Sequence, residues 1–307
     1  MIERYQQGAI VKQRILSKIK RWLPIRSVSR QGISRLTLRF GKRDLPSALG
    51  IGKKRSLATF QGLIADCVQA HGSIDVHFIV DDAVDDDDVY ALIRFAHRLG
   101  CKTDVLISGV GVTEAVAERL LLCGTAWVWI PFGGVSSEVH FQSVGLSIEQ
   151  STQGLQQLLV SRQEVESSTK IGMLMPWVGQ TPTQMDPLRE WAEELGVDSW
   201  QPHLPYFGKD MANEPVPNHQ HLNSLFQFVL QDSSVQPGWK RRQPWSCPVG
   251  KRRLEVSKYG RVCACPHKKP IVWEGETLSS LQSRLRDHRQ EVHQCDRVCL
   301  HRELRFV

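Results

Sequence analysis

The feature that most constrains the fold is a regular alternation of strand-like and helix-like segments between residues 33 and 205. Short runs rich in apolar and β-branched residues predict strands, and longer amphipathic segments predict the helices between them. The predicted strands are Ile33–Phe40, Ile74–Val80, Lys102–Ile107, Trp127–Ile130, Lys170–Met175 and Ser199–Leu204. The predicted helices are Leu57–Ala70, Val89–Leu99, Thr113–Cys123, Ser151–Ser161 and Met185–Leu195, with a looser stretch around Gly133–Gly145.

Strands that alternate with helices imply right-handed β-α-β crossovers and a parallel sheet. Six such units are too few for a closed eight-stranded barrel, so we expect an α/β fold with an open, partial (β/α)6 barrel. The chain of 307 residues is longer than a usual single domain, which leaves room for a small appendage. We therefore expect a basic N-terminal arm at residues 1–32, the partial barrel at 33–235 and a small cysteine-rich module at 236–307.

Positive charge is concentrated at the start of the chain. Residues 1–55 hold fifteen Lys and Arg against Glu3 and Asp44, whereas the whole chain carries a formal net charge of only +7. Residues 8–23 predict an amphipathic basic helix that ends at Pro24. Such a helix suits a protein or peptide partner, with nucleic acid or a membrane surface as less favoured alternatives, or it packs on its own domain with its cationic face in solvent.

The loops that follow the predicted strands carry few signs of chemistry. Asp85–Asp88 precede a predicted helix, where carboxylates cap the first turn and favour the positive end of the helix dipole. Ser108–Gly111 lacks the third glycine of a dinucleotide fingerprint and is read as a tight turn. The histidines form no paired metal motif. No catalytic residue is therefore assigned.

Eight cysteines without a secretion signal favour metal binding or catalysis over a disulfide framework. Cys67, Cys101 and Cys123 are isolated in apolar segments and are read as small buried residues. The other five lie between residues 247 and 299.

This cysteine-rich tail predicts a small metal module. Residues 253–265 read as a β-hairpin with its turn near Lys258–Gly260, so that Cys247 and Cys265 flank the hairpin. A short helix at Leu278–His288 leads to Cys295 and Cys299. Four thiolates suit either zinc or a [4Fe–4S] cluster, so the number of ligands does not choose between them.

The run Cys247…Gly260-Arg261-Val262-x-x-Cys265…Cys295-x-x-x-Cys299 resembles the auxiliary-cluster region, named twitch or SPASM, of radical SAM enzymes. Three residues separate Cys295 from Cys299, where the family usually has two. The resemblance implies one [4Fe–4S] cluster held by Cys247, Cys265, Cys295 and Cys299, with Cys263 as an alternate ligand. Radical SAM enzymes are also six-stranded partial barrels, and Leu36–Phe40 is similar to their first strand.

Two departures from this family concern its chemistry. Family members hold the cluster that cleaves S-adenosylmethionine with three cysteines after the first strand, but the corresponding loop here, residues 42–49, contains no cysteine. The glycine-rich segment after the second strand is replaced by Val80–Val84. The resemblance therefore implies a radical-SAM-like pseudoenzyme that does not use S-adenosylmethionine and acts as a binding or electron-transfer partner for a peptide or a radical SAM enzyme.

Two alternatives remain at this point. The chain is a divergent, active radical SAM maturase or another iron–sulfur enzyme, or it is a structural zinc protein whose tail mediates an interaction. No run approaches the roughly 18 apolar residues of a membrane span, and the basic N-terminus lacks a secretory signal, so a cytoplasmic location is expected.

Overall fold

The computed structural model describes residues 33–40, 54–80, 86–176, 182–203, 253–263 and 271–290. The predicted basic arm at 1–32 and the cysteine-free loop at 42–49 lie outside the described residues. All elements below belong to a unit that begins at Ile33. None of the described helices is both long enough and apolar enough to cross a membrane.

All six predicted strands are present, and they form parallel pairs in one sheet. They are β1 (Arg35–Arg39), β2 (Asp75–Val80), β3 (Lys102–Ile107), β4 (Trp127–Pro131), β5 (Lys170–Pro176) and β6 (Ser199–His203). Neighbours in the sheet follow the order of the sequence from β1 to β6. This topology confirms the predicted α/β fold with an open parallel sheet.

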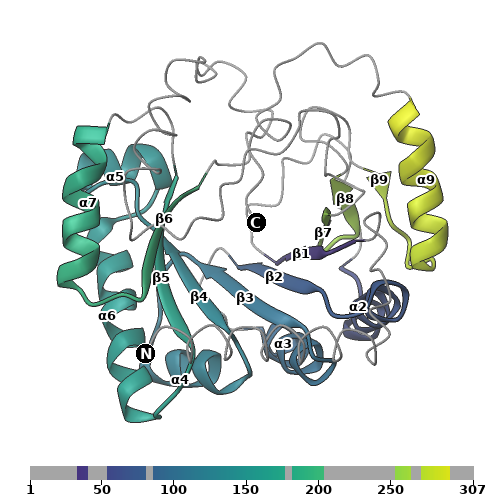
Figure 1. The fold of residues 1–307 in the computed structure, drawn as a ribbon, viewed down its shortest axis with the longest axis horizontal. Coiled ribbons are helices and arrows are strands. Elements are labelled where there is room, and N and C mark those ends of the chain that lie inside the picture. Colours follow the sequence, from purple (N-terminus) through teal and green to yellow (C-terminus); the bar gives the residue numbers. More distant parts are fainter. Residues whose placement is uncertain are drawn as a thin grey trace, which may run out of the picture. The chain divides into compact units, whose positions relative to one another are not determined.

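The five predicted helices are also present, and they lie along one face of the sheet (Figure 1). They are α2 (Leu57–His71), α3 (Asp87–Arg98), α4 (Glu114–Leu122), α6 (Ile148–Glu164) and α7 (Pro182–Glu194). A capping side chain begins four of them, because Ser56, Asp86, Thr113 and Ser147 each accept a hydrogen bond from a backbone amide of the first turn. The expected loop around Gly133–Gly145 was wrong in part, since it contains helix α5 (Ser137–Val144).

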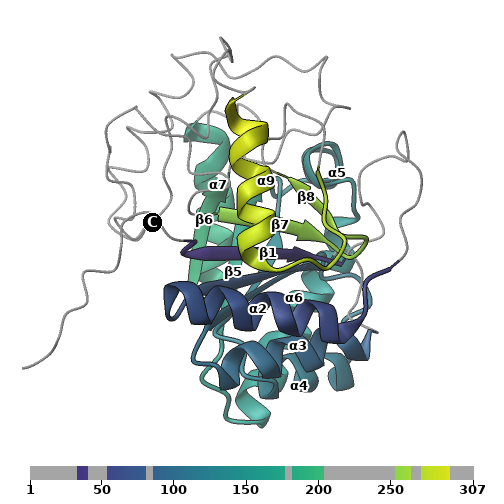
Figure 2. The same cartoon turned by 90° about the vertical axis from the view of Figure 1, so that its right-hand side faces the viewer.

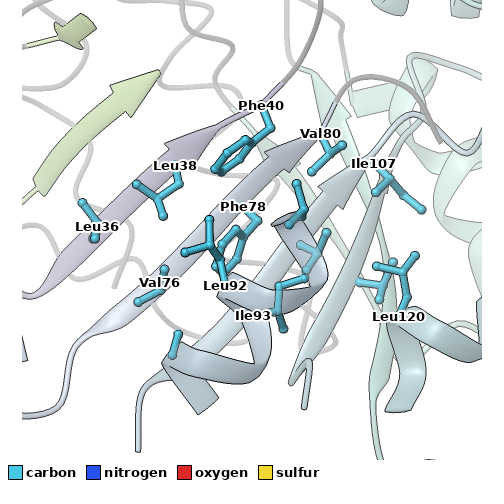
Figure 3. Close-up of a cluster of buried hydrophobic side chains, with 14 of the residues drawn as sticks. Leu36, Leu38, Phe40, Val76, Phe78, Val80, Leu92, Ile93, Ile107 and Leu120 are labelled. Carbon is cyan, nitrogen blue, oxygen red and sulfur yellow. The ribbon is translucent and has the colours of Figure 1, made fainter. Parts of the chain in front are cut away.

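The hydrophobic core lies between the sheet and these helices. Alternate residues of each strand point to this side, as Leu36, Leu38 and Phe40 do on β1. Figure 3 shows them beside Val76, Phe78 and Val80 of β2, with Leu92 and Ile93 of α3 packed over the strands. The remaining residues of each strand face the other side of the sheet, which we call the inner face.

The predicted hairpin is confirmed, and it continues the same sheet. Strand β7 (Arg253–Ser257) pairs in parallel with β1, and β8 (Arg261–Cys263) and β9 (Ile271–Val272) follow as antiparallel strands (Figure 2). Gly260 at the turn has φ +75°, and a Cβ there would lie 2.4 Å from the Trp273 carbonyl oxygen. Helix α9 (Leu278–Gln290) follows, two residues longer than predicted.

Candidate functional site on the inner face of the sheet

Strand register determines which side chains meet on the inner face. The pairing aligns His77 of β2 with Asp104 of β3, Asp104 with Trp127 of β4, and Trp127 with Lys170 of β5. Charged groups gather toward the amino ends of the strands, where Arg35 and Asp75 form an ion pair at 3.6 Å. Toward the carboxyl ends the next row is uncharged, with Ile79, Leu106, Trp129 and Gly172 in corresponding positions.

The most perturbed acid of this face is Asp104, which is 7% exposed. Its Oδ2 lies 3.4 Å from Nε2 of His77. Its Oδ1 is buried and has no hydrogen-bond partner within the described ranges. Burial raises the pKa of Asp104 to about 6, against an opposing effect of the nearby cations Lys102 and Arg35. This carboxyl can therefore exchange a proton near neutral pH.

An aromatic pair lies next to this acid. The rings of Trp127 and Trp129 stack with centroids 4.6 Å apart and an interplanar angle of 10°. Trp129 covers Gly172 so closely that a Cβ at position 172 would lie 2.3 Å from the indole. The ammonium group of Lys170 lies 5.3 Å from the Trp127 ring. Gly172 thus provides the space in which Trp129 crosses the neighbouring strand.

The other end of the inner face joins the sheet to the hairpin. Nε of Arg39 on β1 donates a 3.0 Å hydrogen bond to Oε1 of Glu255 on β7. The side chains of these residues are 24% and 12% exposed, so their ion pair is shielded from water. Backbone bonds extend the junction, because the Lys258 amide donates to Arg39 and the Arg55 amide donates to Lys258. The hairpin turn is thereby fixed beside the carboxyl end of β1.

A buried histidine lies beyond the carboxyl ends of β3 and β4. Nε2 of His140 on α5 is 3.4 Å from the Ser151 hydroxyl on α6, which in turn donates to the Ser108 carbonyl oxygen at 3.2 Å. The turn at Ser108–Gly111 is confirmed, with φ +82° at Gly109 and +72° at Gly111. It packs on the first turns of α6.

The acidic run after β2 has the predicted capping role where it is described. Oδ1 of Asp86 accepts from the Asp88 amide at 3.1 Å and caps α3. The ammonium group of Lys54 is 3.0 Å from Asp86 and 3.2 Å from Asp88. This contact fixes the end of the loop that connects β1 to α2.

The predicted cluster ligands Cys247, Cys265, Cys295 and Cys299 lie outside the described residues. The backbone of Cys263 is described, and it pairs with Glu255 in the hairpin. Within the described ranges no group of three His, Cys, Asp or Glu residues is arranged to hold a metal ion. Cys67, Cys101 and Cys123 are buried and free, as predicted, and burial raises the pKa of the Cys67 thiol to about 12.

Two contacts that define this site were not predicted from the sequence. The His77–Asp104 contact arises from strand register, and the His140–Ser151 contact from a helix that was not expected. Asp104 did carry a signal, since it is a charged residue directly before the apolar run Val105–Ile107 of the same predicted strand. A charged residue in a strand covered on its other side by helices points to the inner face.

No protein-family model matches the sequence, and no curated protein matches it either. Solved structures do. The crystal structures of Streptococcus suis SuiB bound to S-adenosylmethionine and to the precursor peptide SuiA align with TM-scores of 0.57 and 0.60 and identities of 11% and 10%. Each alignment covers 82% of this chain but only 64% and 65% of SuiB.

A further structure, anSMEcpe with bound AdoMet, aligns with a TM-score of 0.52 and 13% identity over 85% of this chain and 86% of that chain. At these identities the likeness concerns the fold alone, and the chain shares the fold of SuiB and anSMEcpe.

Proposed function

We propose that this chain is a radical-SAM-like iron–sulfur protein that does not cleave S-adenosylmethionine. The observation that carries the proposal is the combination of the fold with the loop after β1. That loop connects Phe40 to Lys54 and contains no cysteine or histidine, whereas radical SAM enzymes carry the three cysteines of their cluster after the first strand. Three thiolates are needed there to hold a cluster that keeps one iron open, and the donor set of this loop does not fit that group.

The tail has the donors for a different cluster. Cys247, Cys265, Cys295 and Cys299 would hold one [4Fe–4S] cluster, with Cys263 as the alternate ligand. The hairpin supports this proposal, since its observed turn agrees with the register from which Cys265 was chosen. When bound, the cluster would supply one-electron chemistry or a fixed structural centre, and zinc is the alternative occupant.

The role that fits these two features is that of a binding or electron-transfer partner. A peptide partner has support from SuiB, which has been crystallised with its precursor peptide. A radical SAM enzyme is the second candidate partner, because a redox-active cluster without its own S-adenosylmethionine site would exchange electrons with a centre on another protein. The basic arm at residues 1–32 would contribute long-range attraction to an acidic partner.

Anaerobic reconstitution tests the proposal. Protein reconstituted with iron and sulfide and reduced with dithionite should contain about four irons per chain. It should produce no 5′-deoxyadenosine from S-adenosylmethionine above the background without protein. An intact radical SAM enzyme treated in parallel provides the positive control. Turnover proportional to protein concentration would refute the loss of activity, and stoichiometric zinc without iron would refute the cluster.

A further inference from the structure

Helix α5 packs against the rest of the molecule with a histidine, where the other helices use apolar side chains. Of its eight residues, His140 alone is buried, with 0% exposure. Two of its three apolar residues, Val139 and Phe141, are 39% and 63% exposed, and the third, Val144, is half-buried. The other helices over the sheet each bury several apolar side chains, such as Leu92 and Ile93 of α3. His140 is therefore the side chain that α5 buries most deeply.

The hydrogen bonds of His140 determine its tautomer. The Ser151 hydroxyl has one proton, and it donates this proton to the Ser108 carbonyl oxygen, which can only accept. Nε2 of His140 must then carry the proton that it shares with the Ser151 oxygen at 3.4 Å. Nδ1 is left as an acceptor, and it is buried with no hydrogen-bond partner within the described ranges.

The surroundings of the ring oppose a second proton. At the end of β4 the Phe132 ring lies 5.4 Å from the imidazole, and the Trp191 ring of α7 lies 5.2 Å from the Phe132 ring. The turn after β3 contributes the uncharged Ser108. Glu149 of α6 is the charged group that favours protonation, but burial outweighs it, and the pKa of His140 is lowered. A proton on Nδ1 would be a buried donor without an acceptor.

We propose that His140 is a pH-sensitive latch, which holds α5 against the carboxyl end of the sheet while its imidazole is neutral and releases α5 when it is protonated. Other contacts of α5 lie nearer the surface. Ser137 donates an exposed hydrogen bond of 2.9 Å to Glu149, and the side chains of Ser143 and Val139 pack on Gly133 and Gly134. This inference concerns α5 alone and does not depend on the proposed cluster.

Release would change the part of the sheet that most often binds ligands. In parallel α/β folds, ligands bind at the carboxyl ends of the strands. Loss of α5 from this position would uncover Phe132, now 0% exposed, and the Gly133–Gly134 turn. Acidification would thus open the end of β4 while the sheet itself remains intact.

Linkage sets the size of the effect. A released imidazole has its ordinary pKa of about 6.5. Because the attached form has a lower pKa, each pH unit below 6.5 should favour release by up to about tenfold, until the pH reaches the pKa of the attached form. Above pH 7 the equilibrium should be independent of pH.

Hydrogen exchange measured by mass spectrometry on the full chain tests the latch between pH 7.5 and 5. After correction for intrinsic exchange rates, amides of residues 137–145 should lose up to about tenfold in protection per pH unit below 6.5. Amides of α3 and α4 should keep theirs. The variant His140→Gln, which can still donate to Ser151 but does not titrate, should show no pH dependence in α5, whether it holds the helix or not.

A matched control is His97→Gln, because His97 is an exposed histidine of α3. This variant should behave as the unmodified protein does. Unchanged protection of α5 across the pH range would overturn the proposal. The same pH dependence in His140→Gln, or a simultaneous loss of protection in α3 and α4, would overturn it as well.

Discussion

Asp104 shows how a single residue of the inner face makes the stability of the fold depend on pH. Its neighbours along β3 are buried, so its carboxyl leaves water when the sheet forms, and burial raises its pKa to about 6. A carboxyl whose pKa is raised in the folded state binds its proton more tightly there than in the unfolded chain. Its contribution to stability is therefore fully present below pH 4 and is lost as the pH rises through about 6.

Replacement of Asp104 by Asn should stabilise the protein at pH 7.5. The folded-state pKa lies about two units above the ordinary value, which corresponds to up to about 3 kcal/mol in the free energy of unfolding. The gain should vanish below pH 4, where the carboxyl is neutral in both states. Urea unfolding at pH 4 and pH 7.5 measures the difference. Asp75→Asn is the matched control, because Asp75 lies on the same face with its side chain 43% exposed.

That control should change stability by less than about 0.5 kcal/mol. A destabilised Asp104→Asn variant at pH 7.5 would mean that the charged carboxylate has a stronger partner than its contact with His77. The sequence could not have revealed this contact. Residues 77 and 104 are distant in sequence, and only the register of β2 against β3 brings them to 3.4 Å.

At the scale of elements, two glycines set the distance between α6 and the turn after β3. Gly109 has φ +82°, and Gly154 lies in the middle of α6. A Cβ on Gly154 would lie 1.9 Å from the Gly109 carbonyl oxygen, a backbone atom that cannot rotate away. The helix must therefore approach the turn at a position where it has no side chain. This close approach also places Ser151, one turn earlier, beside Ser108.

Gly154→Ala should consequently destabilise the protein, despite the better helix propensity of alanine. Displacing a packed helix to remove such a clash costs about 1–3 kcal/mol. Gly62→Ala is the matched control, since Gly62 is an exposed interior residue of α2 with nothing within 4 Å of its added Cβ. That variant should gain about 0.5–1 kcal/mol. Thermal unfolding compares the two, and similar shifts in both would contradict the role of the close approach.

Sequence patterns predicted the helices that bury a stripe of apolar side chains. They did not predict the elements that lack such a stripe. Helices α2, α3, α4, α6 and α7 all have a buried apolar side, and all were expected. Helix α5 buries a histidine instead, and its flanking Gly133-Gly134 and Gly145 are typical of a loop. Strand β9 has two residues, too few for any pattern. The predicted cysteine ligands stay a prediction.

At the scale of the whole molecule, the hairpin and α9 share the core of the parallel sheet. Leu254 and Val256 of β7 are 1% and 0% exposed and belong to the same hydrophobic cluster as Leu36 and Leu38. The Phe60 ring of α2 lies 5.9 Å from the Trp273 ring. Asp66 of α2 also accepts a 3.2 Å hydrogen bond from the first amide of α9. The described residues after 253 thus pack against the parallel sheet, and the expected boundary near residue 235 stays a prediction.

Removal of residues 236–307 should therefore prevent cooperative folding of the remaining chain. The deletion removes β7, which leaves β1 as an open edge, and it uncovers the surfaces that six buried side chains now cover, namely Leu254, Val256, Val262, Trp273, Leu281 and Leu285. Burial of one such side chain stabilises a fold by about 1.5–3 kcal/mol. The six together correspond to about 9–18 kcal/mol, which is comparable with the roughly 5–15 kcal/mol by which most domains are stable.

Circular dichroism during heating measures this outcome. The shortened chain should show no cooperative transition, whereas a chain that lacks only residues 1–32, and so keeps the whole unit that begins at Ile33, should keep the transition of the full protein. If the chain 33–235 instead unfolded cooperatively, with a midpoint temperature near that of the full protein, the sheet would be stable with β1 as its edge strand. The hairpin would then be a separable module, and loss of the proposed cluster would affect the tail alone. If the prediction holds, the same loss should lower the stability of the entire sheet, because β7 links the cysteine-bearing tail to β1 through both backbone pairing and the Arg39–Glu255 ion pair.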